Sequence, residues 1–364
     1  MKERMDLRKS YFPGKYIQGN GAINDLPDLI DLYGGKAFIL LTPSMKDTVM
    51  QRGLAEGQTV EIFRGPCCWQ EVDRLIELVK KDDYTVIVGI GGGKVVDTAK
   101  VIADKLNLRV IMAPSVASSS APYSSCSVMY TPENIYESVY YEKHSPDVLL
   151  VDNQVIINAK PRYLVAGMAD SLAVLFEGRA CLKNEARNSL GAKQPFFAVA
   201  LSQYCFDMLI KYGEQAKAAC ETKVVTPALE RIIEVNLMTA GIAFEGTGLA
   251  AAHAIHNGLT LIPEVHNYIH GEIVAFGVLC ELFLSDAEPQ EMDLVYDFCE
   301  RVGLPTTLAQ LGIANFDRDT VFAAAKMTVE DPYLPHEGKY ITAEDVFAAI
   351  VSADAMGKAR KAKA

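Results

Sequence analysis

The sequence lacks the features that mark membrane-spanning and secreted proteins. No run approaches about 18 consecutive apolar residues, which excludes a transmembrane helix. The opening segment, Met1-Lys2-Glu3-Arg4-Met5-Asp6, has no apolar stretch, so no signal peptide is expected. The eight cysteines are scattered, and the only close pair, Cys67 and Cys68, is adjacent and therefore does not form a CxxC ligand pair. These absences predict reduced thiols in a cytoplasmic protein.

Positive charge is also scarce. The chain has 35 Lys and Arg residues against 46 Asp and Glu residues, for a formal net charge of −11. A chain with this balance is not attracted to polyphosphates or anionic headgroups. We therefore expect neither nucleic acid nor a membrane surface as a partner.

What is present predicts two kinds of architecture in succession. At 364 residues the chain is long enough for two domains. Up to about residue 160, short apolar runs alternate with amphipathic segments, which indicates a doubly wound, mainly parallel sheet. The expected strands are residues 36–42, 59–63, 85–90, 109–112 and 148–152. One helix is expected to begin at residue 43, and two others to span residues 71–81 and 95–104.

Beyond Pro161 the pattern becomes helical. The expected helices are residues 163–180, 195–212, 227–244, 248–259, 271–284 and 343–356. The predicted fold class is therefore an α/β N-terminal domain over residues 1–160, joined to an all-α C-terminal domain over residues 161–364, with a cleft between them.

Histidines are few but clustered. Four of the six, His253, His256, His266 and His270, fall in one short window. His253 and His256 share a helix face, and a loop past Pro263 is long enough to fold His270 back beside His253. One interpretation is a core with hydrogen-bonded histidines. The other is a metal site that lacks only a carboxylate.

Asp170 is the candidate for that carboxylate. It lies among small apolar residues near the start of a predicted helix, where it either complements the helix dipole or is buried beside a partner. Asp170, His253 and His270 together would give three ligands and an open position, the arrangement of a catalytic zinc site.

Two loops follow predicted strands and have the composition of ligand-binding turns. The first, Gly89-Ile90-Gly91-Gly92-Gly93-Lys94, lets backbone N–H groups approach a phosphate, although it lacks the P-loop spacing. Asp97 and Lys100 behind it are either a solvated pair or face the cofactor. The second, residues 114–126, is rich in hydroxyls and begins at the edge where open α/β sheets bind ligands.

Taken together, these motifs resemble the iron-containing alcohol dehydrogenase superfamily, in its glycerol dehydrogenase-like branch, which shares its architecture with dehydroquinate synthase. The resemblance runs from end to end. It rests on Gly14-Lys15-Tyr16-Ile17-Gln18-Gly19, Gly91-Gly92-Gly93-Lys94, Asp97-Thr98-Ala99-Lys100, Leu164-Val165-Ala166-Gly167-Met168-Ala169-Asp170, Ala251–Leu259, His270-Gly271-Glu272, Val274-Ala275, Thr342-Ala343-Glu344-Asp345-Val346 and Ala353-Asp354-Ala355.

The resemblance implies a role for each matching position. It places the metal ligands at Asp170, His253 and His270 and a further active-site histidine, near the nicotinamide, at His256. Iron-dependent members have an extra histidine where this chain has Val174, which favours Zn²⁺ over Fe²⁺ or another divalent ion. The implied cofactor contacts are Gly92, Gly93, Lys94, Asp97, Ser115, Ser118, Ser124, Cys126 and Tyr130.

Two positions depart from the glycerol dehydrogenase pattern. Thr42 replaces an Asp that holds the adenosine ribose, so NAD is expected with NADP tolerated. Ser120 replaces an Asp that contacts the substrate, which makes glycerol doubtful, and Tyr123 is expected to narrow the pocket.

The implied activity is hydride transfer between a nicotinamide and a small alcohol, diol or hydroxy acid, with the metal lowering the pKa of the substrate hydroxyl. His256 or a water would relay the proton, and a homo-oligomer is expected. Three alternatives stay open: a hydroxycarboxylate dehydrogenase of the same family, a dehydroquinate synthase-like cyclising lyase, and a non-catalytic cofactor-binding protein. The lyase would require several Lys or Arg residues at the cleft, where few are expected.

Overall fold

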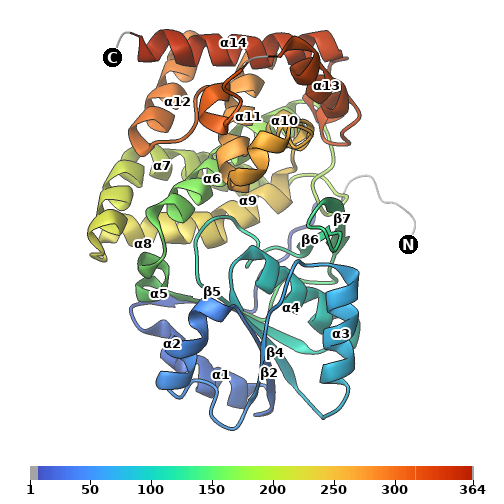
Figure 1. Ribbon diagram of the computed structural model, residues 1–364, viewed down its shortest axis with the longest axis vertical. Helices are drawn as coiled ribbons and strands as arrows, with labels where there is room; N and C mark the ends of the chain where they lie inside the picture. Colours follow the sequence, from blue (N-terminus) through green and yellow to red (C-terminus); the bar gives the residue numbers. More distant parts are fainter. Residues whose placement is uncertain (1–6, 316, 363–364) are drawn as a thin grey trace.

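A computed structural model describes residues 7–315 and 317–362. Residues 1–6, on which the expectation of no signal peptide depends, lie outside this part. Within it, a parallel sheet flanked by helices forms one half of the molecule and a bundle of helices forms the other (Figure 1). The predicted fold class, an α/β part followed by an all-helical part, is confirmed.

The main sheet of the described part has six parallel strands in the order β1-β8-β5-β4-β2-β3. All five predicted strands are present within two residues of the expected ends. Sequence reasoning missed the edge strand β1, which pairs with β8, and the antiparallel hairpin of β6 and β7. The bounds are β1 Lys15–Gly19, β2 Ala37–Leu41, β3 Thr59–Ile62, β4 Val86–Gly91, β5 Arg109–Pro114, β6 Cys126–Tyr130, β7 Tyr136–Tyr141 and β8 Val148–Asp152.

Successive residues of the buried strands point to opposite faces of the sheet. In β2, Phe38 and Leu40 pack into a core shared with α3 and α4, whereas Ile39 and Leu41 pack into a second core with α1 and α2. Covering both faces explains why these strands are apolar throughout rather than alternating. The helices are α1 Leu26–Leu32, α2 Lys46–Gln51, α3 Trp69–Val79, α4 Gly93–Leu106 and α5 Asn153–Asn158.

The helical part begins at Pro161, where proline is favoured because the first helical N–H has no intrahelical partner. The predicted helix over residues 227–244 is continuous but includes a π-helical segment at Val235–Thr239. Sequence reasoning missed α12 and α13. The bounds are α6 Pro161–Lys183, α7 Phe196–Thr222, α8 Pro227–Glu234, α9 Ala240–Thr247, α10 Ala251–Leu259, α11 His270–Leu284, α12 Pro289–Val302, α13 Arg318–Val329 and α14 Ala343–Lys361. None of the helices in the described part is both long and apolar enough to cross a membrane.

Three of these helices approach one another unusually closely. A Cβ added to Gly271 at the start of α11 would lie 2.0 Å from the carbonyl oxygen of Ala166 on α6. A Cβ at Gly277, further along α11, would lie 2.3 Å from the carbonyl oxygen of Ala252 on α10. Only glycine permits such contact between backbones. The close packing brings together the ends of α10 and α11 that carry the clustered histidines.

Candidate metal centre and cofactor edge

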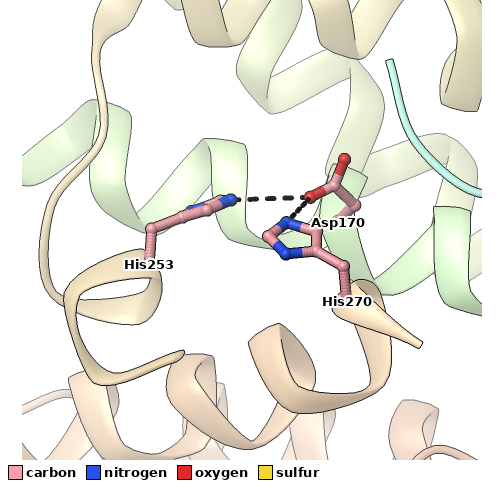
Figure 2. Close-up of side chains that lie close together, drawn as sticks. All are labelled: Asp170, His253 and His270. Atoms are coloured by element: carbon pink, nitrogen blue, oxygen red, sulfur yellow. Dashed lines mark ion pairs between the residues drawn. The ribbon is translucent and has the colours of Figure 1, made fainter. Parts of the chain in front are cut away.

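Asp170, His253 and His270 converge from α6, α10 and α11 (Figure 2). Nε2 of His253 lies 3.5 Å from Oδ1 of Asp170, and Nε2 of His270 lies 3.2 Å from the same oxygen. One donor atom from each residue lies within 4.8 Å of the others. Two imidazole nitrogens and a carboxylate oxygen at this spacing fit a divalent ion. The His270 side chain is 43% exposed, which leaves one side of the group open.

The charge distribution also favours a cation. Burial raises the pKa of Asp170, but hydrogen bonds with His253 and His270 outweigh burial, and the net effect is a pKa below its ordinary value. Burial lowers the pKa of His253, whereas Glu177 and Asp170 raise it, with a net result of about 10. A proton is therefore held tightly where a divalent ion would bind and displace it.

Glu177 supports His253 from behind. It is fully buried, and its Oε2 accepts a hydrogen bond from Nδ1 of His253 at 2.7 Å. Its Oε1 accepts from the backbone N–H groups of Ala250 and His253, each at 2.9 Å. A carboxylate in this position fixes the ring so that Nε2 faces the ligand site. Sequence reasoning missed Glu177, although it lies seven residues after Asp170, a spacing that places both on one side of α6.

His256 contacts the outer ring nitrogen of His270 and not the three ligand atoms themselves. Its Nε2 lies 2.9 Å from Nδ1 of His270, and its Nδ1 lies 2.9 Å from Oδ1 of Asn257. Burial, followed by the nearby charge of His270, lowers the pKa of His256 well below its ordinary value. His266 lies apart from this cluster, and its Nε2 contacts the carbonyl oxygen of Thr260. Three of the four clustered histidines therefore meet.

The glycine-rich turn joins β4 to α4 at the carboxyl edge of the sheet. Gly92 is the N-cap of α4 and provides no side-chain hydrogen bond to the first turn. A Cβ added to Gly93 would meet nothing within 4 Å, whereas one at Gly91 would lie 2.8 Å from Val95 and 3.1 Å from Thr42. Packing therefore requires glycine at position 91 but not at 93, where the open space and helix N-terminus suit an anion such as a pyrophosphate.

The hydroxyl-rich loop is anchored from beneath by Lys100. Its buried Nζ donates to the carbonyl oxygens of Ala121 at 2.8 Å and Ser124 at 3.1 Å, and to Oγ of Ser124 at 3.1 Å. It also lies 3.1 Å from Oδ1 of Asp97. The pair is therefore buried rather than solvated.

Asp97 and Ser124, two of the predicted cofactor contacts, lie largely inside the protein. Asp97 is 5% exposed and Ser124 is 2% exposed. Both are engaged with Lys100, so they support the loop from inside the protein.

The remaining predicted cofactor positions are accessible around the same edge. Thr42, Ser115, Ser118, Cys126 and Tyr130 are all partly exposed. The backbone N–H of Ser115 donates to the carbonyl oxygen of Gly91, which ties the second loop to the first. Nζ of Lys94 lies 5.0 Å from the ring centroid of Tyr130 and contacts Oδ1 of Asn134.

Tyr123 does not narrow a pocket, contrary to the prediction. It has no exposed surface, its hydroxyl donates to the carbonyl oxygen of Tyr11, and its ring packs so tightly on α9 that a Cβ at Gly241 would lie 2.4 Å away. Ser120, on the same loop, keeps 6% of its surface exposed.

The comparisons with known proteins extend over most of the chain. The family model described as iron-containing alcohol dehydrogenase matches residues 13–153. A glycerol dehydrogenase of Thermotoga maritima is 43% identical over 361 residues, which cover 98% of this chain and 99% of that protein. The crystal structure of a probable glycerol dehydrogenase from Sinorhizobium meliloti 1021 superposes with a TM-score of 0.92 at 35% identity, covering 97% of this chain and 99% of that one. Hydroxycarboxylate dehydrogenase A of Escherichia coli K12 is 29% identical, covering 89% of this chain and 91% of that protein.

Proposed function

The chain belongs to the iron-containing alcohol dehydrogenase family, in its glycerol dehydrogenase-like branch, and we propose that it transfers a hydride between NAD and a small alcohol, diol or hydroxy acid at a metal centre. The observation that carries the proposal is the convergence of Asp170, His253 and His270 from three helices. Zn²⁺ is the proposed ion because Val174, buried on α6, stands where a fourth ligand would be expected.

Each group of residues has a defined task in this reaction. Asp170, His253 and His270 would hold the divalent ion, which supplies the Lewis acidity that lowers the pKa of the substrate hydroxyl. Glu177 keeps His253 in the orientation that presents Nε2. The exposed side of His270 leaves room for the substrate.

The cofactor is proposed to lie along the carboxyl edge of the sheet. Backbone N–H groups at Gly92 and Gly93 would bind the pyrophosphate of NAD, and its nicotinamide supplies the hydride acceptor. Lys100 keeps the 115–126 loop in shape for this contact. Thr42 adds no negative charge near the ribose, so NADP is expected to be tolerated.

The hydroxycarboxylate alternative remains a second candidate because one relative, Hydroxycarboxylate dehydrogenase A, bears that name. Ser120 has no charge, so it would not repel an anionic substrate from the centre. Outside the site, a cytoplasmic homo-oligomer that binds neither nucleic acid nor a membrane surface is proposed from the sequence alone.

A substrate panel tests the proposal. The zinc-loaded enzyme is assayed by NADH absorbance with glycerol, less polar diols and small 2-hydroxy acids, and with the oxo acids in reverse. We expect turnover with at least one of these substrate classes. In His253→Ala we expect this turnover to fall by a factor of about 10² or more, because the variant removes a group that holds the catalytic ion. Undiminished turnover in His253→Ala would contradict the assignment. A protein that produces no net NADH with any of these substrates but catalyses a cyclising reaction with NAD bound would support the lyase alternative.

A further inference from the structure

We propose that Asn257 and Asp331 are positioning residues of the metal centre, which act through His256 to fix the ring nitrogen that His270 presents to the ion. The inference rests on the proposed metal site and adds to it two residues that the motifs did not single out. It follows from the direction in which a chain of hydrogen bonds must run.

The chain starts at the partly buried Asp331. Oδ2 of Asp331 lies 2.8 Å from Nδ2 of Asn257, and Oδ1 of Asn257 lies 2.9 Å from Nδ1 of His256. Nε2 of His256 then lies 2.9 Å from Nδ1 of His270, whose Nε2 faces Asp170 at 3.2 Å. Asn257 and His256 thus connect the ligand His270 with Asp331, a carboxylate on another element.

Only one direction of donation satisfies the three contacts that run from Asp331 to Nδ1 of His270. A carboxylate can only accept, so the amide NH₂ of Asn257 must face Asp331 and its oxygen must face His256. Nδ1 of His256 must therefore have the proton, which leaves the lone pair of Nε2 to accept from Nδ1–H of His270. Without an ion, Nε2 of His270 shares a proton with Asp170, and it is the nitrogen whose lone pair would bind a metal that replaces this proton.

The same direction argues against His256 as the acceptor of the substrate proton. Nδ1–H of His256 donates a hydrogen bond to Oδ1 of Asn257, and the lone pair of its Nε2 already accepts a hydrogen bond from His270. An amide in the chain does not pass a proton onward as a water or a carboxylic acid does. Of the two predicted routes, relay by water is the one that this geometry leaves open.

Asp331 is held independently of α10. It lies just beyond the end of α13, and its Oδ1 accepts from the backbone N–H of Tyr333 at 2.9 Å. α13 packs closely on α10, since a Cβ at Gly258 would lie 2.0 Å from Oγ1 of Thr328. The position of Asp331 is therefore fixed by the turn after α13, and this helix packs against α10, which carries Asn257 and His256.

Three variants test the inference. In Asp331→Asn, residue 331 can also donate, so Asn257 is free to turn over and His256 is no longer confined to one tautomer. We expect its affinity for Zn²⁺ to fall about 10-fold to 100-fold, the usual effect of losing an outer partner of a ligand histidine. Glu330→Gln removes the same charge from the exposed neighbouring residue and should leave the affinity unchanged.

The third variant exchanges the two groups. In Asn257→Asp combined with Asp331→Asn, the carboxylate at 257 accepts from His256 and the amide at 331 donates to it. Composition and net charge equal those of the wild type, and the direction of the chain is restored. We expect its Zn²⁺ affinity to lie within about threefold of wild type. This is smaller than the loss of at least about tenfold, or 1.4 kcal/mol, expected for Asp331→Asn alone.

Zn²⁺ affinity is measured on metal-free protein by competition with a chelating dye, and visible spectra of the Co²⁺-substituted proteins report the ligand geometry. Thermal melts confirm that each variant is folded. Equal affinities in wild type and Asp331→Asn, equal losses in Asp331→Asn and Glu330→Gln, or an exchange variant as weak as Asp331→Asn would each overturn the inference. A wild-type protein that binds no Zn²⁺ would instead overturn the proposed metal site, and the inference with it.

Discussion

Single buried polar residues do much of the organising around the candidate site. Glu177 accepts hydrogen bonds from both the ring and the backbone of His253, and Lys100 donates to carbonyl oxygens of the 115–126 loop. Groups of this kind are costly to bury without partners, so each is placed where several partners converge. Their effects can be tested one residue at a time.

Ser120 is the residue expected to decide the preference among alcohols. A carboxylate at this position would accept hydrogen bonds from a polyol, whereas a hydroxyl is a weaker acceptor. We predict that Ser120→Asp shifts the ratio of kcat/KM for glycerol over a small 2-hydroxy acid toward glycerol, about tenfold for 1.4 kcal/mol of differential binding. Steady-state kinetics with both substrates measures the ratio, with Ser119→Asp on the same loop as a control. A wild-type enzyme that prefers glycerol over every other compound would contradict this role for Ser120.

Glu142 gives a prediction about pH. It follows β7 and is 7% exposed, and burial raises its pKa from 4.5 to about 7 although Lys100 opposes the change. Between these values the folded state binds a proton that the unfolded state has released, so stability falls as pH rises from 4.5 to about 7 and then levels off. Glu142→Gln should remove this slope, worth up to ~3 kcal/mol because each pKa unit corresponds to about 1.4 kcal/mol.

Urea unfolding across this pH range measures the slope. Glu137→Gln, at an exposed position on β7, is the matched control and should keep the wild-type dependence. Parallel curves for wild type and Glu142→Gln would contradict a raised pKa of Glu142 in the folded protein.

At the scale of elements, the site depends on how closely three helices approach. α11 touches α6 and α10 through glycines, and α10 begins against buried carboxylates of other helices. The ligands are therefore placed by backbone contacts rather than by flexible side chains.

Gly271→Ala tests this dependence. The added methyl group would lie 2.0 Å from the carbonyl oxygen of Ala166, so α11 must move away from α6. We expect a loss of about 1–3 kcal/mol in stability, typical of overpacking, together with weaker Zn²⁺ binding because His270 moves relative to Asp170. Gly19→Ala, where the methyl group meets nothing within 4 Å, is the control for both chemical unfolding and metal titration. If Gly271→Ala is less stable but binds Zn²⁺ as tightly as wild type, the close packing of α11 on α6 does not determine the position of His270.

For the whole molecule, the metal should tie the helical part together. The ligands lie on α6, α10 and α11, so an ion bound only to the folded state stabilises all three at once. Free Zn²⁺ at 1,000 times its dissociation constant would add about 4 kcal/mol. The proton on His253, whose pKa is about 10 without metal, competes with the ion. The gain should therefore shrink as pH falls.

Thermal melts with and without a chelator at several pH values measure this gain. We expect the chelator to lower Tm most at alkaline pH and least at acidic pH, and to have no effect on His253→Ala. A wild-type Tm that does not respond to the chelator at any pH would contradict the predicted link between metal and stability.

Much of this molecule was determined by local sequence. Continuous apolar runs such as residues 85–90 predict strands buried on both faces, and the switch to helical periodicity after Pro161 predicts the second part, because both patterns depend only on the period of the chain. The histidine window and Asp170 predicted the metal ligands from residue type and motif. The short strand β1 was missed because its partner, β8, lies more than a hundred residues away.

Tertiary structure alone decided which polar groups face inward and which partner orients each ligand. The sequence places Ser124 beside Ser118 and Asp97 beside the glycine turn, yet Lys100 draws both inside. Glu177 has a periodic relation to Asp170, but its contact with His253 depends on α10 packing against α6. Asp331 is separated from Asn257 in the sequence by three helices, α11, α12 and α13, and only the packing of α13 against α10 brings the two side chains within 2.8 Å. Hydrogen bonds act over about 3 Å, whereas sequence patterns record only the local period, so long-range partners become visible only in the folded chain.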